Sequence, residues 1–134
     1  MEKLENKICL DSDFLIDLMK GKKEEVEFIA GNRENAVMAT TCMNIFELYE
    51  GIHKSPHPQK NIEAVETVTE GLEILELDKN IAARAGELSA RLEKKGRMIG
   101  FKDILIGAIA KENGYAFKTK NKKHFGMIEG LRLI

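Results

Sequence analysis

The sequence predicts a single α/β domain, residues 1–134, with a central, mainly parallel five-stranded sheet flanked by helices. Three observations lead to this fold class. Short apolar runs alternate with segments of helical periodicity, which is the order expected of a parallel sheet covered on both faces. The chain is long enough for one domain with a substantial core. Residues 101–125 read as helix, glycine, short strand and polar turn, which is half of a parallel α/β unit.

The predicted strands are short apolar runs at residues 7–10, 36–40, 73–77, 115–119 and 131–134. Runs of this length, bounded by polar residues or glycine, are typical of buried strands. The first run stops at Asp11, where a strand gives way to a helix. Open α/β sheets bind ligands beyond the carboxyl ends of their strands, so Asp11 is a candidate site residue.

Helical patterns fill the segments between these strands. Ser12 or Asp13 is suited to cap the first helix, which runs to Gly21, and residues 22–32 form a second helix. Asn44 lies near the start of a third helix, which ends before a proline-rich loop. A fourth helix is expected over residues 61–71.

Two helices in the second half of the chain carry the clearest patterns. Asp78 is expected to cap the first of them, whose inward positions are Ile81, Ala85, Leu88 and Leu92. The other has Asp103 in its first turn and ends at Gly114, where a positive φ is expected. Its apolar positions are Phe101, Ile104, Leu105, Ala108 and Ile109.

Composition and charge indicate a globular protein of the cytoplasm. Apolar residues make up 43% and charged residues 32%, and no run approaches the roughly 18 apolar residues of a membrane helix. Residues 1–7 contain acids and no apolar centre, so they do not read as a signal peptide. Cys9 and Cys42 are expected to be reduced thiols. A net charge of −1 gives no overall attraction to nucleic acid, so such a site would rely on local charge or bound metal.

Asp11, Glu47 and Asp103 each lie at the end of a predicted element, and a parallel sheet can bring all three to one edge. Each acid also has a purely structural interpretation. The Asp11–Asp13 segment is suited to turns and caps, and Asn44 with Glu47 matches a capping box. Asp103 is favoured near a helix start by the dipole. Both interpretations stand at this point.

Convergence of the three carboxylates would favour a bound cation. Two carboxylates about 5 Å apart repel by roughly 3 kcal/mol at an effective dielectric constant near 20. Such a cluster takes up protons or binds a cation, and oxygen ligands favour Mg²⁺ or Mn²⁺. No Cys/His set has zinc-site spacing, and His53 and His57 belong to the proline-rich loop.

Four segments in order resemble the signatures of PIN-domain proteins, specifically VapC-type toxins. They are Ile-Cys-Leu-Asp-Ser-Asp at 8–13, Asn-Ile-Phe-Glu-Leu-Tyr-Glu-Gly at 44–51, Ile-Gly-Phe-Lys-Asp-Ile-Leu-Ile-Gly-Ala at 99–108 and Thr-Lys-Asn-Lys-Lys-His-Phe at 119–125. The resemblance implies a PIN-like three-layer fold and a Mg²⁺- or Mn²⁺-dependent endoribonuclease. It also implies a cognate VapB-type antitoxin, and Asp11, Glu47 and Asp103 as catalytic metal ligands. A homodimer is expected as well.

The last segment departs from the family, which often has a fourth acid there. Asn121 is a candidate ligand that brings an oxygen without charge, and His124 is not acidic either. Ser12 and Thr119 are supporting residues, with Thr119 expected to hydrogen-bond an active-site acid. Candidates for holding RNA phosphates are Lys118, Lys120, Lys122 and Lys123, although a solvated turn explains them equally well.

In the implied mechanism, the metal binds the scissile phosphate and activates a water, leaving a 3′-hydroxyl and a 5′-phosphate. Three alternatives remain open. The Asp11-Ser-Asp13 motif also resembles the nucleophile motif of haloacid-dehalogenase-type phosphatases. A receiver-like domain has acids at strand ends too, but the third strand here lacks the central phosphoacceptor Asp. A PIN-like module could also bind RNA or an antitoxin without cutting.

Overall fold

The structure, a computed structural model, describes residues 6–134. The strands are β1 (Asn6–Leu10), β2 (Ala36–Thr41), β3 (Glu73–Leu75) and β4 (Ala116–Lys118). The helices are α1 (Ser12–Met19), α2 (Lys23–Asn32), α3 (Cys42–His53), α4 (Pro58–Thr69), α5 (Lys79–Lys94), α6 (Phe101–Glu112) and α7 (Lys122–Phe125). The prediction that the N-terminus is not a signal peptide concerns mainly residues 1–5, which lie outside the described residues.

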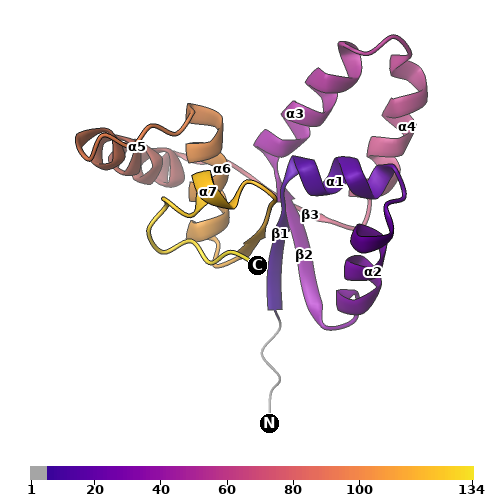
Figure 1. The fold of residues 1–134 in the computed structure, drawn as a ribbon, viewed down its shortest axis with the longest axis horizontal. Helices are drawn as coiled ribbons and strands as arrows, with labels where there is room; N and C mark the ends of the chain where they lie inside the picture. Colours follow the sequence, from indigo (N-terminus) through magenta and orange to yellow (C-terminus); the bar gives the residue numbers. More distant parts are fainter. Residues whose placement is uncertain (1–5) are drawn as a thin grey trace.

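The four strands form one parallel sheet in the order β3-β2-β1-β4, with β1 and β2 at its centre (Figure 1). The predicted α/β class and parallel sheet are confirmed, but the prediction of five strands is wrong. Residues 131–134 run beside β4 and pair with it only through an isolated bridge between Phe117 and Leu133. A single bridge does not extend into a ladder, so this segment covers the edge of β4 without becoming a strand.

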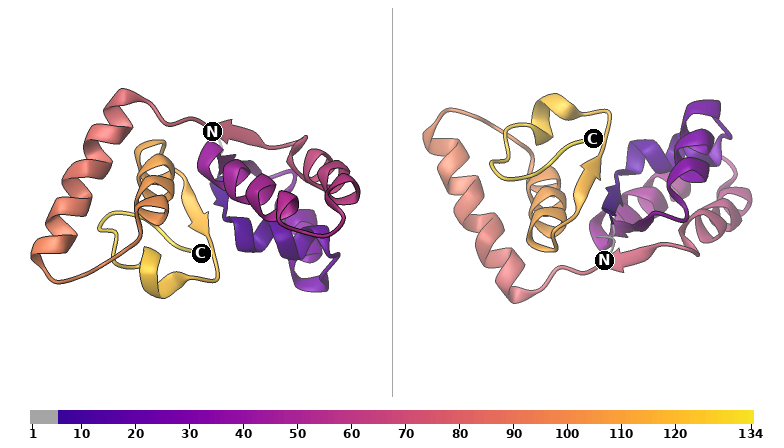
Figure 2. Two further views of the ribbon diagram at one scale, coloured as in Figure 1. Left: turned by 90° about the horizontal axis from the view of Figure 1, so that it is seen from above. Right: turned by 90° about the horizontal axis from the view of Figure 1, so that it is seen from below.

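Helices cover both faces of the sheet, so the side chains of β1 are buried on both sides. Cys9 points into a core formed with α5, α6 and α7, whereas Ile8 and Leu10 point into a second core formed with α1, α3 and α4. The two groups of helices lie on opposite sides of the strands (Figure 2). The predicted three-layer arrangement is therefore confirmed.

The order of the strands creates a switch point between β1 and β4. From β1 the chain moves outward to β2 and β3, and it later returns to place β4 on the other side of β1. Open α/β sheets bind ligands at the carboxyl ends of the strands on either side of such a point. Here these ends lead into Asp11 and Thr119, and the Asp11 backbone N–H donates to the Lys118 carbonyl oxygen across 3.0 Å.

The helix starts differ from two of the expectations. Asp11 itself, not Ser12 or Asp13, caps α1, since its Oδ1 accepts from the Ser12 backbone N–H. The cap of helix α3 lies three residues earlier than expected, so its capping box joins Thr41 to Asn44. Asn44 with Glu47 is therefore not a capping box. Both differences arise because a polar residue outside the expected segment reaches the first free N–H groups.

The second half of the chain follows its pattern more closely. The Asp78 side chain accepts from the Ile81 backbone N–H across 2.8 Å, and all four predicted inward positions of α5 are buried. Gly114, with φ of 76°, ends α6 as predicted. Phe101 is an exception: it is 71% exposed because it occupies the first turn of α6, beyond the edge of the core. Within residues 6–134, no helix combines the length and the apolar character that crossing a membrane requires.

Candidate active site

Asp11 is the centre of the candidate site. It is 7% exposed, and both of its carboxylate oxygens accept hydrogen bonds from other elements. Asn44 Nδ2 donates to Oδ1 across 2.9 Å, and Thr119 Oγ1 donates to Oδ2 across 2.6 Å. The hydrogen bond expected of Thr119 is thus present, and its acceptor is Asp11. These contacts join β1, α3 and the turn after β4 at a single buried carboxylate.

Glu47 is joined to Asp11 through Asn44 and Ser12. Ser12 Oγ donates to Glu47 Oε1 across 2.7 Å, and Asn44 Nδ2 also reaches Ser12 Oγ at 2.9 Å and Glu47 Oε1 at 3.4 Å. Asn44 Oδ1 accepts from the Thr41 hydroxyl across 2.8 Å, which directs the amide nitrogen toward the acids. We call Asp11, Ser12, Asn44, Glu47 and Thr119 the acid cluster.

Burial raises the pKa of Asp11 to about 6, because the ionised carboxylate loses solvation. The negative charges of Asp13 and Glu47 raise this pKa further, while the hydrogen bonds from Thr119 and the Ser12 backbone lower it. Ionisation of Asp11 at this site therefore costs free energy, and a cation beside the carboxylate would favour the ionised form.

Asp13 has a partly satisfied carboxylate beside the cluster. Its Oδ2 accepts from the Lys120 backbone N–H across 3.0 Å, and Thr119 Oγ1 lies 3.5 Å from the same oxygen. Its Oδ1 is buried and has no hydrogen-bond partner among residues 6–134. An unpaired buried carboxylate oxygen is costly, and a cation or a water is the usual partner for one.

Asp103 occupies the first turn of α6, away from the contacts of the acid cluster. Its Oδ2 lies 3.5 Å from Nδ1 of His124 on α7, and no described residue links it by a hydrogen bond to Asp11 or Glu47. Helix α6 leads through Gly114 into the start of β4, so its first turn lies toward the end of β4 that leads to Thr119. The structure thus brings Asp11 and Glu47 together and sets Asp103 beside an imidazole.

The donor chemistry around the acid cluster fits a hard divalent cation. Asp11, Asp13 and Glu47 offer carboxylate oxygens, and Oδ1 of Asp13 is unpaired within the described part of the chain. Mg²⁺ and Mn²⁺ prefer such oxygen donors. In residues 6–134, however, no three His, Cys, Asp or Glu side chains already lie close enough together to hold a metal ion. Occupancy by Mg²⁺ or Mn²⁺ therefore stays a prediction.

Asn121 approaches the cluster through its backbone. Its N–H donates to Thr119 Oγ1 across 3.0 Å, and its side chain does not cap α7. Thr119 thus accepts from Asn121 while donating to Asp11, which orients the hydroxyl. Asn121 therefore supports Thr119 through its main chain, whereas its expected role as a ligand concerns the side-chain oxygen and stays a prediction.

The four lysines near the end of β4 differ in what they contact. The ammonium of Lys118 lies 4.8 Å from the centroid of the Phe28 ring, a cation–π geometry. Lys120 pairs with the buried Asp17, whose pKa it holds below the usual range. Lys122 and Lys123 are exposed and form no ion pair with any described residue. They are the better candidates for contacting phosphates.

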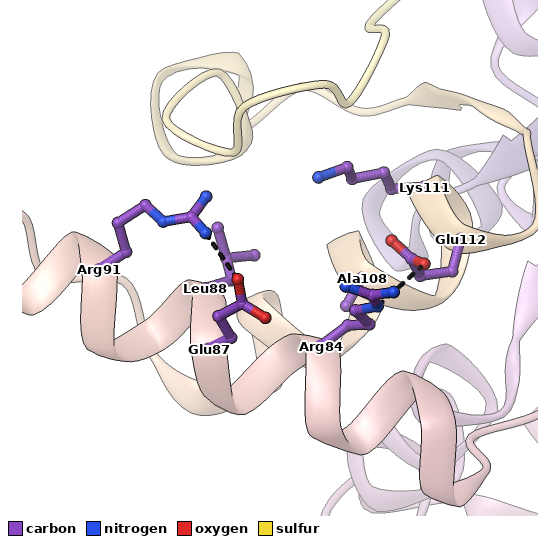
Figure 3. Close-up of a pocket in the computed structure, with 7 residues that line it drawn as sticks. All are labelled: Arg84, Glu87, Leu88, Arg91, Ala108, Lys111 and Glu112. Atoms are coloured by element: carbon purple, nitrogen blue, oxygen red, sulfur yellow. Dashed lines mark hydrogen bonds and ion pairs between the residues drawn. The ribbon is translucent and has the colours of Figure 1, made fainter.

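Of the concavities on the surface, one adjoins the acid cluster and another lies apart from it. One, of about 560 Å³, adjoins Thr119 and is lined by Phe14, Glu24, Glu25, Glu27, Phe28, Lys118, Thr119, Lys120 and Lys122. The other, of about 180 Å³, lies between α5 and the C-terminal end of α6 (Figure 3). Ion pairs of Arg84 with Glu112 and of Arg91 with Glu87 occupy its wall. It is at the opposite end of α6 from Asp103 and is separate from the acid cluster.

Two residues of the site are not identified as functional by the sequence. The sequence indicates only a capping role for Asn44, although its spacing of three residues from Glu47 places both on one face of α3. For His124 it indicates only that the residue is not an acid. The contact of His124 with Asp103 depends on how α7 folds back toward α6, and no local pattern encodes that.

Comparison with known proteins places the chain in a family. The PIN domain model matches residues 8–128. A Haemophilus influenzae protein named ribonuclease VapC2 is 32% identical over 94% of this chain and 95% of its own length. A Salmonella typhimurium protein named tRNA(fMet)-specific endonuclease VapC is 31% identical over 95% of this chain and 96% of its own length.

Solved structures agree with this placement. The chain resembles one in the DNA-bound VapBC complex of Salmonella typhimurium, with a TM-score of 0.88 and 29% identity over 96% of this chain and 97% of that one. It also resembles one in VapBC2 of Rickettsia felis bound to a promoter DNA fragment, with a TM-score of 0.90, 26% identity and the same coverage. These matches favour the PIN-domain interpretation over the phosphatase and receiver-like alternatives. The chain belongs to the PIN domain family, among its VapC-type members.

Proposed function

We propose that this chain is a single-domain endoribonuclease, a VapC-type toxin that hydrolyses phosphodiester bonds in RNA. The observation that carries the proposal is the acid cluster at the switch point of the sheet. There one buried amide, Asn44, contacts both Asp11 and Glu47, which come from different elements. The relatives named ribonuclease VapC supply the substrate class.

We propose Mg²⁺ or Mn²⁺ as the cofactor, held by Asp11, Glu47 and Asp103. When bound, such an ion supplies charge stabilisation at the phosphate and lowers the pKa of a coordinated water. The protein's own contribution is orientation: Asn44, Ser12 and Thr119 each hold a carboxylate oxygen of the cluster in a fixed direction. Preorganised groups of this kind do not need to rearrange when charge develops during the reaction.

The partners follow from the same family. Two solved structures that resemble this chain are VapBC complexes, so we propose a VapB-type antitoxin as partner. We also propose a homodimer as the assembled form and the cytoplasm, where RNA is available, as the location. Production of the parent chain alone should stop bacterial growth. Production of the Asp11→Asn variant at the same level should not.

The direct test is cleavage of RNA by the purified full chain with Mg²⁺, with Mn²⁺ and with a chelator. The parent should cut only with metal. Asp11→Asn, Glu47→Gln and Asp103→Asn should each lower the rate by about 100-fold or more, which corresponds to roughly 3 kcal/mol of transition-state stabilisation. Glu66→Gln, an exposed carboxylate on α4, is the matched control and should cut like the parent.

Two outcomes would contradict the proposal. Equal cleavage by the parent and by all three acid variants would show that the site lies elsewhere. Absence of cleavage with either metal, combined with tight binding of RNA or of the antitoxin, would support the alternative of a non-cleaving module.

A further inference from the structure

The Asp103 carboxylate faces an imidazole nitrogen that has no other partner among the described residues. Nδ1 of His124 lies 3.5 Å from Oδ2 of Asp103, beyond the usual 2.7–3.2 Å range of an N–H···O hydrogen bond. This nitrogen is buried, and no residue within 6–134 hydrogen-bonds to it. The His124 side chain as a whole is 45% exposed, so the pair lies at the edge of the protein.

The position of His124 is fixed by its neighbour in the chain. Phe125 is 1% exposed and its ring packs against Phe117 of β4, with ring centroids 4.6 Å apart. Gly126 closes α7 tightly, and a Cβ there would lie only 2.6 Å from the Lys122 carbonyl oxygen. The core thus anchors α7, which carries His124. The packing of Phe125 therefore directs the imidazole of His124 toward Asp103.

The distance between the two atoms suits a shared metal ion. Two donors that bind one divalent ion at about 2.1 Å in neighbouring positions lie roughly 3.0–3.5 Å apart. An imidazole nitrogen beside a carboxylate is a common pair in transition-metal sites, whereas Mg²⁺ is usually bound through oxygen alone. The donor that this chain offers in place of a fourth acid is therefore a nitrogen.

We propose that Nδ1 of His124 is a metal ligand beside Asp103, and that it makes the site prefer Mn²⁺ to Mg²⁺. This inference rests on the proposed ribonuclease function, because it concerns the metal of that site. It assigns to His124 the role that the sequence suggested for Asn121. Asn121 contributes its backbone N–H to Thr119, whereas the group seen beside Asp103 is the imidazole of His124.

A simpler alternative is that His124 only orients Asp103 through a hydrogen bond. The two roles are separated by His124→Asn, because the asparagine amide can place an N–H donor near the position of Nδ1 but can offer a metal only its side-chain oxygen, so no nitrogen would be bonded to the ion. His57→Asn is the matched control, since His57 is exposed at the start of α4 and its side chain does not cap that helix.

The experiment is pulsed electron paramagnetic resonance of Mn²⁺ bound to the full chain, which detects nitrogen nuclei bonded directly to the ion. The parent and His57→Asn should both show the nitrogen coupling, and His124→Asn should not. Calorimetric titration should show Mn²⁺ binding weakened on the order of tenfold or more in His124→Asn, with Mg²⁺ binding changed much less. His124→Asp, which restores an oxygen donor, should bind Mg²⁺ more tightly than the parent does.

Several outcomes would overturn the inference: no binding of Mn²⁺ by the parent, bound Mn²⁺ without nitrogen coupling, or coupling that survives in His124→Asn. A failure of this inference can be distinguished from a failure of the proposed ribonuclease function. Metal-dependent cleavage of RNA without nitrogen coupling would leave the ribonuclease in place and remove His124 from the site. Coupling without cleavage would keep His124 as a ligand and contradict the ribonuclease.

Discussion

The side-chain amide of Asn44 donates to Oδ1 of Asp11 across 2.9 Å, between residues 33 positions apart in the chain. Asn44 is fully buried and its amide oxygen is held by Thr41, so the amide cannot turn away. This contact fixes the relative position of β1 and α3, the elements that carry Asp11 and Glu47. It explains how two acids that repel each other are kept side by side.

Replacement of Asn44 by Ala should damage both stability and activity. The variant removes one of the two donors to Oδ1 of Asp11 and the acceptor of the buried Thr41 hydroxyl, and leaving buried polar groups underbonded costs about 1–3 kcal/mol. Urea unfolding should show a decrease of this size, and RNA cleavage should fall more than stability alone explains. Asn113→Ala is the control, because Asn113 also donates through Nδ2, to the Ile109 carbonyl, but far from the acids. A similar fall in cleavage in Asn44→Ala and in Asn113→Ala would contradict a positioning role for Asn44.

The stability of the metal-free protein should depend on pH through Asp11. Its pKa is about 6 in the folded chain, against about 4 when unfolded, so the folded state holds more protons between these values. The contribution of Asp11 to the free energy of unfolding therefore falls as pH rises from about 4 to about 6, by on the order of 2–3 kcal/mol.

The Asp11→Asn variant has no carboxylate to titrate at this position, so its comparison with the parent measures the contribution of Asp11 to stability. Urea unfolding of the parent and the variant in chelator should be compared at several pH values on both sides of this range. The stability of the variant relative to the parent should rise with pH across the range and level off above the folded pKa of about 6. A difference that stays constant with pH would show that Asp11 titrates normally.

Lys122 and Lys123 should contribute to RNA affinity through charge alone. For single-stranded RNA, each phosphate that a protein no longer neutralises lowers the slope of log affinity against log salt by roughly 0.7, so the double Gln variant should show a slope lower by about 1.4. Lys94→Gln with Lys95→Gln, at the end of α5, is the matched control for net charge. Filter binding of RNA to the Asp11→Asn background avoids cleavage. An unchanged slope in the Lys122 and Lys123 variant would identify these residues as part of a solvated turn.

Lys120 should behave as a structural residue. Its ammonium pairs with the buried Asp17, which Lys22 also contacts at 3.0 Å. Lys120→Met should therefore lower stability because it removes one of the partners of a buried carboxylate. RNA affinity per folded molecule should change little. A fall in RNA affinity equal to that of the Lys122 and Lys123 variant, with stability unchanged, would be inconsistent with the ion pair.

Asn121→Ala should have only a small effect on cleavage, because it is the backbone N–H of Asn121 that donates to Thr119. Asn121→Asp, in contrast, adds a charge near the site and should tighten binding of a divalent cation. Calorimetric titration with Mn²⁺ measures this change. A defect in cleavage in Asn121→Ala as severe as that in Asp103→Asn would make the Asn121 side chain a ligand.

The amino-acid sequence by itself determined the features that depend on neighbouring residues. Alternating strands and helices, the cap at Asp78 and the glycine end at Gly114 all follow from patterns within a few positions. The placement of Asp11 at the end of a strand also follows from such a pattern. The ordered motifs predicted the PIN domain family, which the family model and the relatives confirm.

The tertiary structure decided which distant residues meet. Thr119 contacts Asp11 across 108 positions because the strand order places β4 beside β1, and no local signal states that order. His124 faces Asp103 because the burial of Phe125 orients α7. Residues 131–134 have a strand-like sequence but meet β4 at one bridge only. Contacts between remote segments depend on the packing of whole elements, so the local sequence limits them without specifying them.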